Sequence, residues 1–94
     1  MLKHGTPSKG ARVILFVAPG SGSISVVAGR MVGGSVSRNR ARRILRAAWR
    51  EIAPRTRDDL DVVLVARRPI RGAKAQDLVT EMTDLARDAG VTQS

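Results

Sequence analysis

Six arginines crowd into residues 38–50 of this 94-residue chain, with no carboxylate among them. Residues four apart share one face of a helix, and four of these arginines follow that spacing: Arg38, Arg42, Arg46 and Arg50. Asn39 and Arg43 lie beside this arginine row, whereas Arg40 lies away from it. Like charges at this spacing cost roughly a few tenths of a kcal/mol per pair. Because nothing in the segment offsets that cost, the row predicts a polyanionic partner, namely nucleic acid.

The rest of the chain offers no convincing catalytic group. His4 is the only histidine, and we expect it to be a solvated surface residue. Asp58, Asp59 and Asp61 are interpreted as a polar turn rather than a Mg²⁺ site. The glycine-rich segment 29–34 lacks the Gly-Lys-Ser/Thr ending of a phosphate loop. The residues therefore indicate an RNA or DNA binder rather than a self-sufficient enzyme.

The charge is divided unevenly along the chain. The net charge is +9, yet residues 1–50 contain no acid and all eight acids follow. A GC-rich genome would enrich arginine throughout, but it would not remove acids from one half. The asymmetry therefore favours a polyanionic partner.

The composition indicates one folded domain over residues 1–94. Apolar residues make up 43% of the chain, which is too many for a disordered basic tail. The absence of cysteine excludes disulfides and thiolate metal sites. No apolar run is long enough for a membrane span, so we expect no membrane partner and a cytoplasmic location.

Hydrophobic periodicity predicts the elements that position the arginines. We expect an irregular start over 1–11, a β-hairpin over 12–31 with antiparallel strands, and a basic helix over 35–53. Ser35 or Ser37 is expected to cap that helix, and Pro54 to end it. A strand over 60–67 and a covering helix over 73–89, closed by Gly90, complete the order.

This β-β-α-β-α order, with a possible short extra strand near the start, predicts an α+β fold. We expect a two-layer α/β sandwich with the helices on one face of the sheet. The strands on either side of the basic helix could lie parallel.

Apolar residues of the basic helix form a stripe that is expected to face the core: Ala41, Ile44, Leu45, Ala48 and Ile52. Trp49 lies between this stripe and the arginine row, and we expect it to pack at the helix edge. Phe16 could stack on an unpaired base, but the residues alone favour a core position.

A known family shares these features. Residues 32–46, VGGSVSRNRARRILR, resemble the signature of the bacterial ribonuclease P protein component, whose core is R-N-R. Residues 61–67 resemble the strand that follows the family's basic helix. Residues 3–6 and 13–17 resemble its first hairpin. The resemblance covers nearly the whole chain in the right order.

The resemblance implies an α/β sandwich with a left-handed β-α-β crossover, an exception to the usual handedness. It also implies a function, in which the protein assists a catalytic RNA that removes the 5′ leader from precursor tRNA. In that complex the RNA subunit, with bound Mg²⁺, carries out the hydrolysis, and the protein alone holds no metal. We expect one protein per RNA, and otherwise a monomer.

The resemblance also assigns residues to two RNA contacts. The contact with the RNA subunit comprises Arg38, Asn39, Arg40, Arg42, Arg43 and Arg46, and Arg50 extends the row. The contact with the precursor-tRNA leader comprises Phe16, Val26, Ala28 and Arg30. For Phe16 the resemblance reverses the core interpretation in favour of base contact.

Two departures from the family pattern bear on the leader. The family normally begins with about twenty more residues, including a short helix whose F-x-x-V motif forms one wall of the leader groove, and this chain starts just after that point. Met31 occupies a position that is usually basic. We therefore expect leader recognition to be affected more than binding of the RNA subunit.

Other functions remain open from the residues. The main alternative is a ribosomal-protein-like or general structured-RNA-binding domain with no part in tRNA processing. A DNA-binding protein would place the arginine helix in a major groove, but the chain lacks the second short helix and turn of that motif. A self-sufficient nuclease fits least well.

Overall fold

The computed structural model describes residues 7–55 and 59–90, so His4 and Asp58 lie outside the described residues. Its strands are β1 (Ser8–Lys9), β2 (Val13–Pro19), β3 (Ile24–Val27) and β4 (Leu60–Ala66). Its helices are α1 (Ser35–Ile52) and α2 (Ala75–Ala89), with three short 3₁₀ turns, η1 (Arg30–Val32), η2 (Ala53–Arg55) and η3 (Arg68–Ile70).

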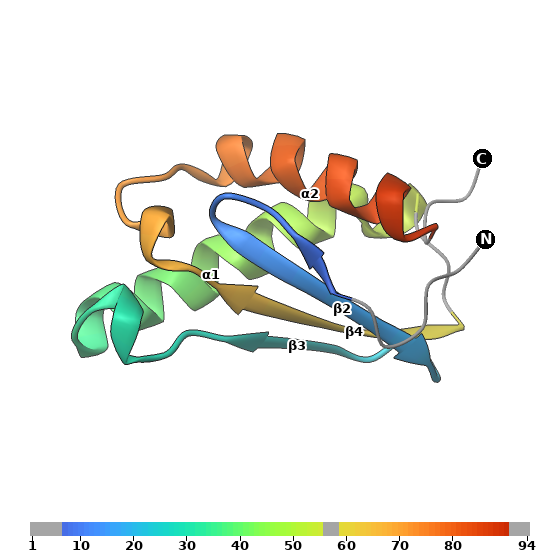
Figure 1. The fold of residues 1–94 in the computed structure, drawn as a ribbon, viewed down its shortest axis with the longest axis horizontal. Coiled ribbons are helices and arrows are strands. Elements are labelled where there is room, and N and C mark those ends of the chain that lie inside the picture. Colours follow the sequence, from blue (N-terminus) through green and yellow to red (C-terminus); the bar gives the residue numbers. More distant parts are fainter. Residues whose placement is uncertain (1–6, 56–58, 91–94) are drawn as a thin grey trace.

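The strands form one sheet in the order β1-β2-β4-β3. Strand β2 is antiparallel to both β1 and β4, whereas β3 is parallel to β4. Helix α1 is the crossover between this parallel pair, and α2 lies beside it on the same face of the sheet (Figure 1). The α+β sandwich, the short extra strand and the parallel arrangement are therefore confirmed.

The predicted β-hairpin over 12–31 is wrong. Strand β4 lies between β2 and β3, so these two strands do not pair. The turn between them is instead drawn to β4, because Ser21 and Ser23 each donate a backbone N–H to Asp61 Oδ1 at 3.0 Å. The expected second strand also ends at Val27, and η1 follows it. Pairing with a strand far along the chain depends on long-range contacts that local periodicity does not show.

Alternate residues of the two long strands form one side of the core. Leu15 of β2 and Leu64 of β4 are register partners, and both are fully buried. Five residues of α1 are buried in the same core: Ala41, Leu45, Ala48, Trp49 and Ile52. The predicted apolar stripe is confirmed, with Ile44 partly buried at its margin. Trp49 belongs to the core itself rather than to the helix edge.

The observed ends of the helices and strands agree only in part with the ends predicted from the sequence. Gly34 is the N-cap of α1, and no side-chain hydrogen bond caps this end, so the prediction of Ser35 or Ser37 is wrong. Helix α1 ends at Ile52, just before the turn that contains Pro54. Strand β4 ends one residue earlier than predicted, and α2 begins two residues later. Gly90 closes α2 in the left-handed conformation at φ 75°, as predicted, because glycine adopts it without strain.

One carboxylate joins the covering helix α2 to the sheet. Glu81 Oε2 accepts backbone N–H bonds from Arg12 at 2.8 Å and from Val13 at 3.0 Å. Glu81 Oε1 also lies 3.4 Å from the Arg12 guanidinium. The Glu81 carboxylate therefore stabilises the packing of α2 against the start of β2.

Candidate nucleic-acid interface

A shallow hollow of about 290 Å³ lies along the solvent-facing side of α1. It is lined by Asn39, Arg42, Arg43, Arg46, Ala47 and Arg50. The structure thus brings five of the residues predicted to contact the RNA subunit to one concave surface, which we call the arginine hollow. This placement follows from the helical period, because burial of the apolar stripe leaves these arginines facing solvent.

No carboxylate is among the described residues that line the arginine hollow. Two ion pairs between described side chains, Arg12 with Glu81 and Arg87 with Asp84, lie outside α1. No acid lies in the first turn of α1 either. The repulsion predicted for the arginine row is therefore not relieved by a carboxylate among the described residues of the hollow.

Asn39 gives the arginine hollow part of its geometry. Its side-chain oxygen Oδ1 accepts a hydrogen bond from Arg42 Nη2, three residues along the helix. This contact orients one guanidinium and leaves its other N–H groups available to a ligand. Arg38 is oriented in a similar way, since its Nη2 lies 3.5 Å from Ser35 Oγ. Charge counting alone cannot identify this role of Asn39.

Arg40 does not line the arginine hollow. Its Nη2 donates to the backbone carbonyl of Ala73 at 2.7 Å, which ties α1 to the segment that leads into α2. Arg40 is half-buried. It lines a different cavity with Arg71, at the end of the sheet. The structure therefore separates Arg40 from the five predicted residues that line the arginine hollow, and Arg38 does not line the hollow either.

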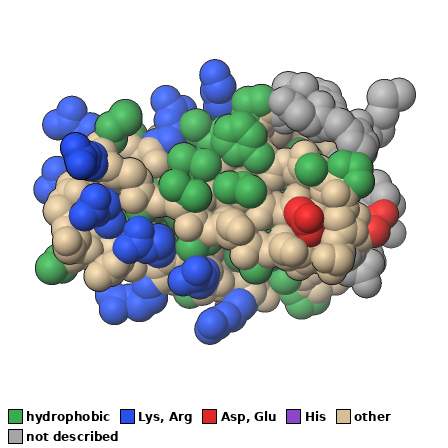
Figure 2. All heavy atoms as spheres, turned by 90° about the horizontal axis from the view of Figure 1, so that it is seen from below, with side chains coloured by type: hydrophobic (Ala, Val, Ile, Leu, Met, Phe, Trp, Pro, Cys, Tyr) green, Lys and Arg blue, Asp and Glu red, His purple; other side chains and the backbone are tan. Residues whose placement is uncertain are grey.

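The face of the sheet opposite the helices carries a second candidate surface. Phe16 and Val63 are register partners on this open face, and the Phe16 side chain is 38% exposed. Val27, on the edge strand, is 47% exposed. Figure 2 shows hydrophobic side chains over the middle of this face, with basic side chains gathered towards one end and along the edges. The structure places Phe16 outside the core.

Two of the residues predicted to contact the leader lie on the other side of the sheet. Val26 is paired with the buried Leu64 and packs against the core, and Ala28 is itself buried. The assignment of Val26 and Ala28 to the same surface as Phe16 is therefore wrong. Because side chains alternate along a strand, the neighbours of Val26 face the open side instead. Arg30 and Met31, in η1, are both exposed.

Asp61 belongs to β4 rather than to a polar turn. Backbone hydrogen bonds from Ser23 and then Ser21 hold the pKa of Asp61 below its ordinary value of 3.8. Among the described residues, no group of three or more His, Cys, Asp or Glu side chains could hold a metal ion. Neither helix of that part of the chain combines the length and the apolar character that crossing a membrane requires.

Comparison with known proteins agrees with this arrangement. The family model named Ribonuclease P matches residues 1–90. The chain belongs to the ribonuclease P protein family. It is accordingly a protein subunit of ribonuclease P, the enzyme of tRNA 5′-end processing, and the resemblance drawn from the R-N-R helix is confirmed.

Individual relatives of this ribonuclease P protein are moderately similar in sequence. The ribonuclease P protein component of Shouchella clausii is 28% identical over 95 residues, a match that covers 97% of this chain and 78% of the relative. The component of Chloroflexus aurantiacus is 40% identical over 81 residues, covering 82% of this chain and 60% of the relative. The match thus spans about three-fifths of the length of the latter.

Solved structures of ribonuclease P proteins share the fold. The Staphylococcus aureus protein matches with a TM-score of 0.76 at 13% identity, covering 94% of this chain and 84% of that one. The Thermotoga maritima protein matches with a TM-score of 0.73 at 14% identity, covering 88% of this chain and 82% of that one. At such low identities the similarity concerns the arrangement of the elements.

Proposed function

We propose that this ribonuclease P protein binds the RNA subunit through the arginine hollow. The observation that carries the proposal is the convergence of four arginines on one concave surface without a lining carboxylate: Arg42, Arg43, Arg46 and Arg50. Guanidinium groups donate paired N–H bonds that match phosphate oxygens. An RNA backbone laid along α1 would replace mutual repulsion among these arginines with attraction.

The precursor-tRNA leader is proposed to bind the open face of the sheet. Phe16 offers an exposed ring on which an unpaired base can stack, and base–aromatic stacking is worth about 1–3 kcal/mol. Arg30 is exposed in η1 and supplies positive charge at the end of the sheet where β3 finishes. Since Val26 and Ala28 face the core, the proposed leader contact rests on Phe16 and Arg30.

The hydrolytic step is proposed to belong to the RNA subunit and its Mg²⁺ ions. The donor set of the protein supports this assignment, because the described acids include no cluster suited to a divalent cation. The protein would then contribute positioning and charge neutralisation rather than a reacting group. We further propose one protein per RNA subunit and a cytoplasmic location.

Processing of precursor tRNA by a bacterial ribonuclease P RNA at low Mg²⁺, with and without this protein, tests the proposal. We expect the protein to stimulate cleavage. The double variant Arg42→Ala plus Arg46→Ala should lose at least about tenfold of that stimulation, because charge-assisted hydrogen bonds contribute roughly 1.5–3 kcal/mol each. Both side chains line the arginine hollow and neither belongs to the buried stripe, so the fold should persist.

Arg87→Ala is the matched control. Arg87 is an exposed arginine on α2, 3.6 Å from Asp84, and it lies outside the arginine hollow. Its loss should leave stimulation unchanged. Normal stimulation by the double variant would contradict the assignment of the hollow. If the protein binds structured RNA but never stimulates cleavage, the general RNA-binding alternative holds instead.

A further inference from the structure

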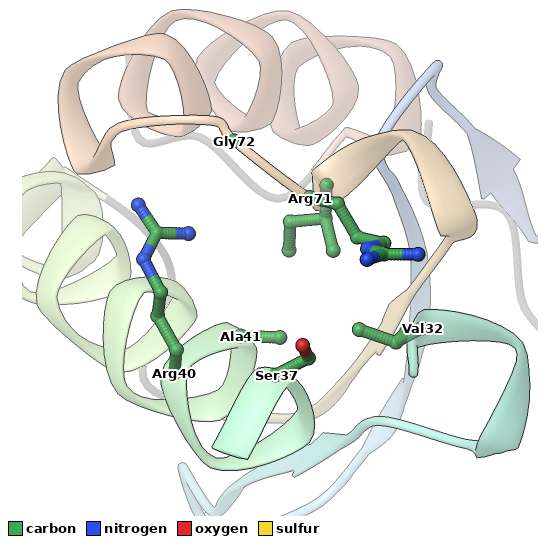
Figure 3. A pocket seen from close by; sticks show the side chains of 7 residues that line it. Val32, Ser37, Arg40, Ala41, Arg71 and Gly72 are labelled. Carbon is green, nitrogen blue, oxygen red and sulfur yellow. The ribbon is translucent and has the colours of Figure 1, made fainter. Parts of the chain in front are cut away.

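A second cavity, of about 360 Å³, lies at the end of the sheet where the parallel strands β3 and β4 finish. Strand β3 leads into η1 and β4 into η3, and the buried residues Val32 and Ile70 of these turns both line the cavity. Its other lining residues are Ser37, Arg40, Ala41, Arg71 and Gly72 (Figure 3). We call it the end cavity. The carboxyl ends of adjacent parallel strands are a common place for ligands in α/β sheets.

The polar side chains of the end cavity favour a negatively charged ligand. Arg40 and Arg71 stand on opposite sides of the cavity, and the Ser37 side chain lies between them (Figure 3). Among the described residues, no carboxylate lines the cavity. Two guanidinium groups and a hydroxyl around one space are complementary to an oxyanion, because each of them can donate a hydrogen bond to oxygen.

One of these guanidinium groups is already held in place. Arg40 Nη2 donates to the Ala73 carbonyl at 2.7 Å, and this bond uses only one of the five N–H donors of arginine. A side chain positioned in this way loses less conformational entropy when it binds a ligand. The Arg40 contact therefore prepares the cavity for an anion as well as joining α1 to the start of α2.

The first turn of α1 adds positive potential beside the end cavity. Ser37 belongs to that turn, which contains no acid and has no side-chain cap. The free N–H groups of a helix start carry partial positive charge. Figure 2 shows basic side chains gathered at the end of the molecule where η1 and the start of α1 lie.

We propose that the end cavity binds one phosphodiester group of RNA, at a site separate from the arginine hollow. The inference rests on the proposed function, since it takes RNA to be the ligand of this chain. It assigns Arg40 to the end cavity rather than to the hollow. It also gives a direct binding role to Arg71, which lies outside the R-N-R helix, and to Ser37.

Arg71→Ala tests this assignment, with Arg68→Ala as the matched control. Both arginines are exposed and belong to the same short segment, but only Arg71 lines the cavity. We expect Arg71→Ala to weaken binding of ribonuclease P RNA about tenfold and to reduce the slope of log K against log salt by about one. Arg68→Ala should leave affinity unchanged. Thermal unfolding of both variants should match that of the parent chain.

Inorganic phosphate provides the second arm of the experiment. Titration followed by amide chemical shifts should move the signals of Ser37 and Gly72, and Arg71→Ala should abolish those shifts. Equal RNA affinity for Arg71→Ala and Arg68→Ala would overturn the proposal. It would be overturned equally if inorganic phosphate moved these signals while Arg71→Ala left RNA affinity normal, because the site would then not hold an RNA phosphate.

The failure of this inference can be distinguished from failure of the proposed function. If Arg42→Ala plus Arg46→Ala weakens RNA binding but Arg71→Ala does not, the end cavity is excluded and the arginine hollow stands. If Arg71→Ala alone weakens RNA binding, the end cavity stands and the hollow is excluded. If neither weakens it, both assignments fall.

Discussion

At the scale of single residues, Asp61 shows how one charged side chain can organise a turn of the fold. Its carboxylate accepts the backbone N–H groups of Ser21 and Ser23 and so holds the β2–β3 turn against the first residues of β4. Gly20 also approaches closely, since a Cβ at that position would collide with the Asp61 carboxylate. Asp61 therefore stabilises the passage of that turn across the end of β4.

Asp61→Asn should destabilise the protein at neutral pH, and the effect should disappear in acid. The folded pKa of Asp61 is lowered by the bonds from Ser23 and Ser21, so its contribution is fully present above the ordinary value of 3.8 and is lost as pH falls through the folded pKa. Urea midpoints measured at pH 7 and at successively lower pH values check this. The midpoints of the two proteins should converge below pH 3.8. The control Asp88→Asn, on an exposed residue of α2, should cause no loss at pH 7.

At the scale of elements, α1 combines two opposing demands. Its buried stripe stabilises the fold, whereas its arginines repel one another along the opposite side. The tertiary contacts of Leu45, Ala48 and Ile52 maintain the helix in spite of this repulsion. Stability and RNA affinity should therefore change in opposite directions when charge is altered in the arginine hollow.

Ala47→Glu should change the stability of the protein and its RNA affinity in opposite directions. Ala47 is exposed and lines the arginine hollow, four residues after Arg43 and three before Arg50. The introduced carboxylate should stabilise the helix by about 0.2–0.5 kcal/mol per pair. Relative to Ala47→Gln, which matches it in size and helix propensity, the two pairs together should raise the melting temperature by about 2–8 °C. RNA affinity should fall about tenfold. A loss of both stability and affinity would contradict the argument.

At the scale of the whole molecule, the structural framework and the basic surface are formed by different elements. The sheet and α2 supply the framework, with Glu81 and Asp61 used for internal contacts. Helix α1 and the two turns that follow β3 and β4 carry most of the exposed arginines. The charge asymmetry of the sequence thus becomes an asymmetry of surface, as Figure 2 shows for one face, where the acids lie away from the basic end.

The salt dependence of RNA affinity should show how many phosphates this basic surface contacts. With about six phosphate contacts, log K for RNA should fall with log salt at a slope of about 4–5 in magnitude. Binding isotherms from low to moderate salt measure this slope. A slope near zero would show that the arginines do not contact phosphates.

Competition between structured RNA and duplex DNA separates the RNA-binding function from a DNA-binding one. Structured RNA should displace the protein from duplex DNA, and duplex DNA should not displace it from RNA. The reverse order of affinities would favour an arginine helix in a major groove.

The amino-acid sequence by itself determined the elements whose signal is local. The period of the basic helix, the alternation in β4 and the glycine at the end of α2 all depend on residues within a few positions of one another. The arginine hollow follows from the same period. These features could be predicted because the helix and the strand impose them wherever they form.

Only the tertiary structure decided which strands pair and which surface each side chain reaches. Val26 and Ala28 face the core because β3 joins β4 in parallel register, and no local pattern in so short a strand reveals that pairing. Arg40 bonds to the Ala73 carbonyl, thirty-three residues along the chain, instead of lining the arginine hollow. Such contacts depend on the packing of distant segments, so the residues around each one do not specify it.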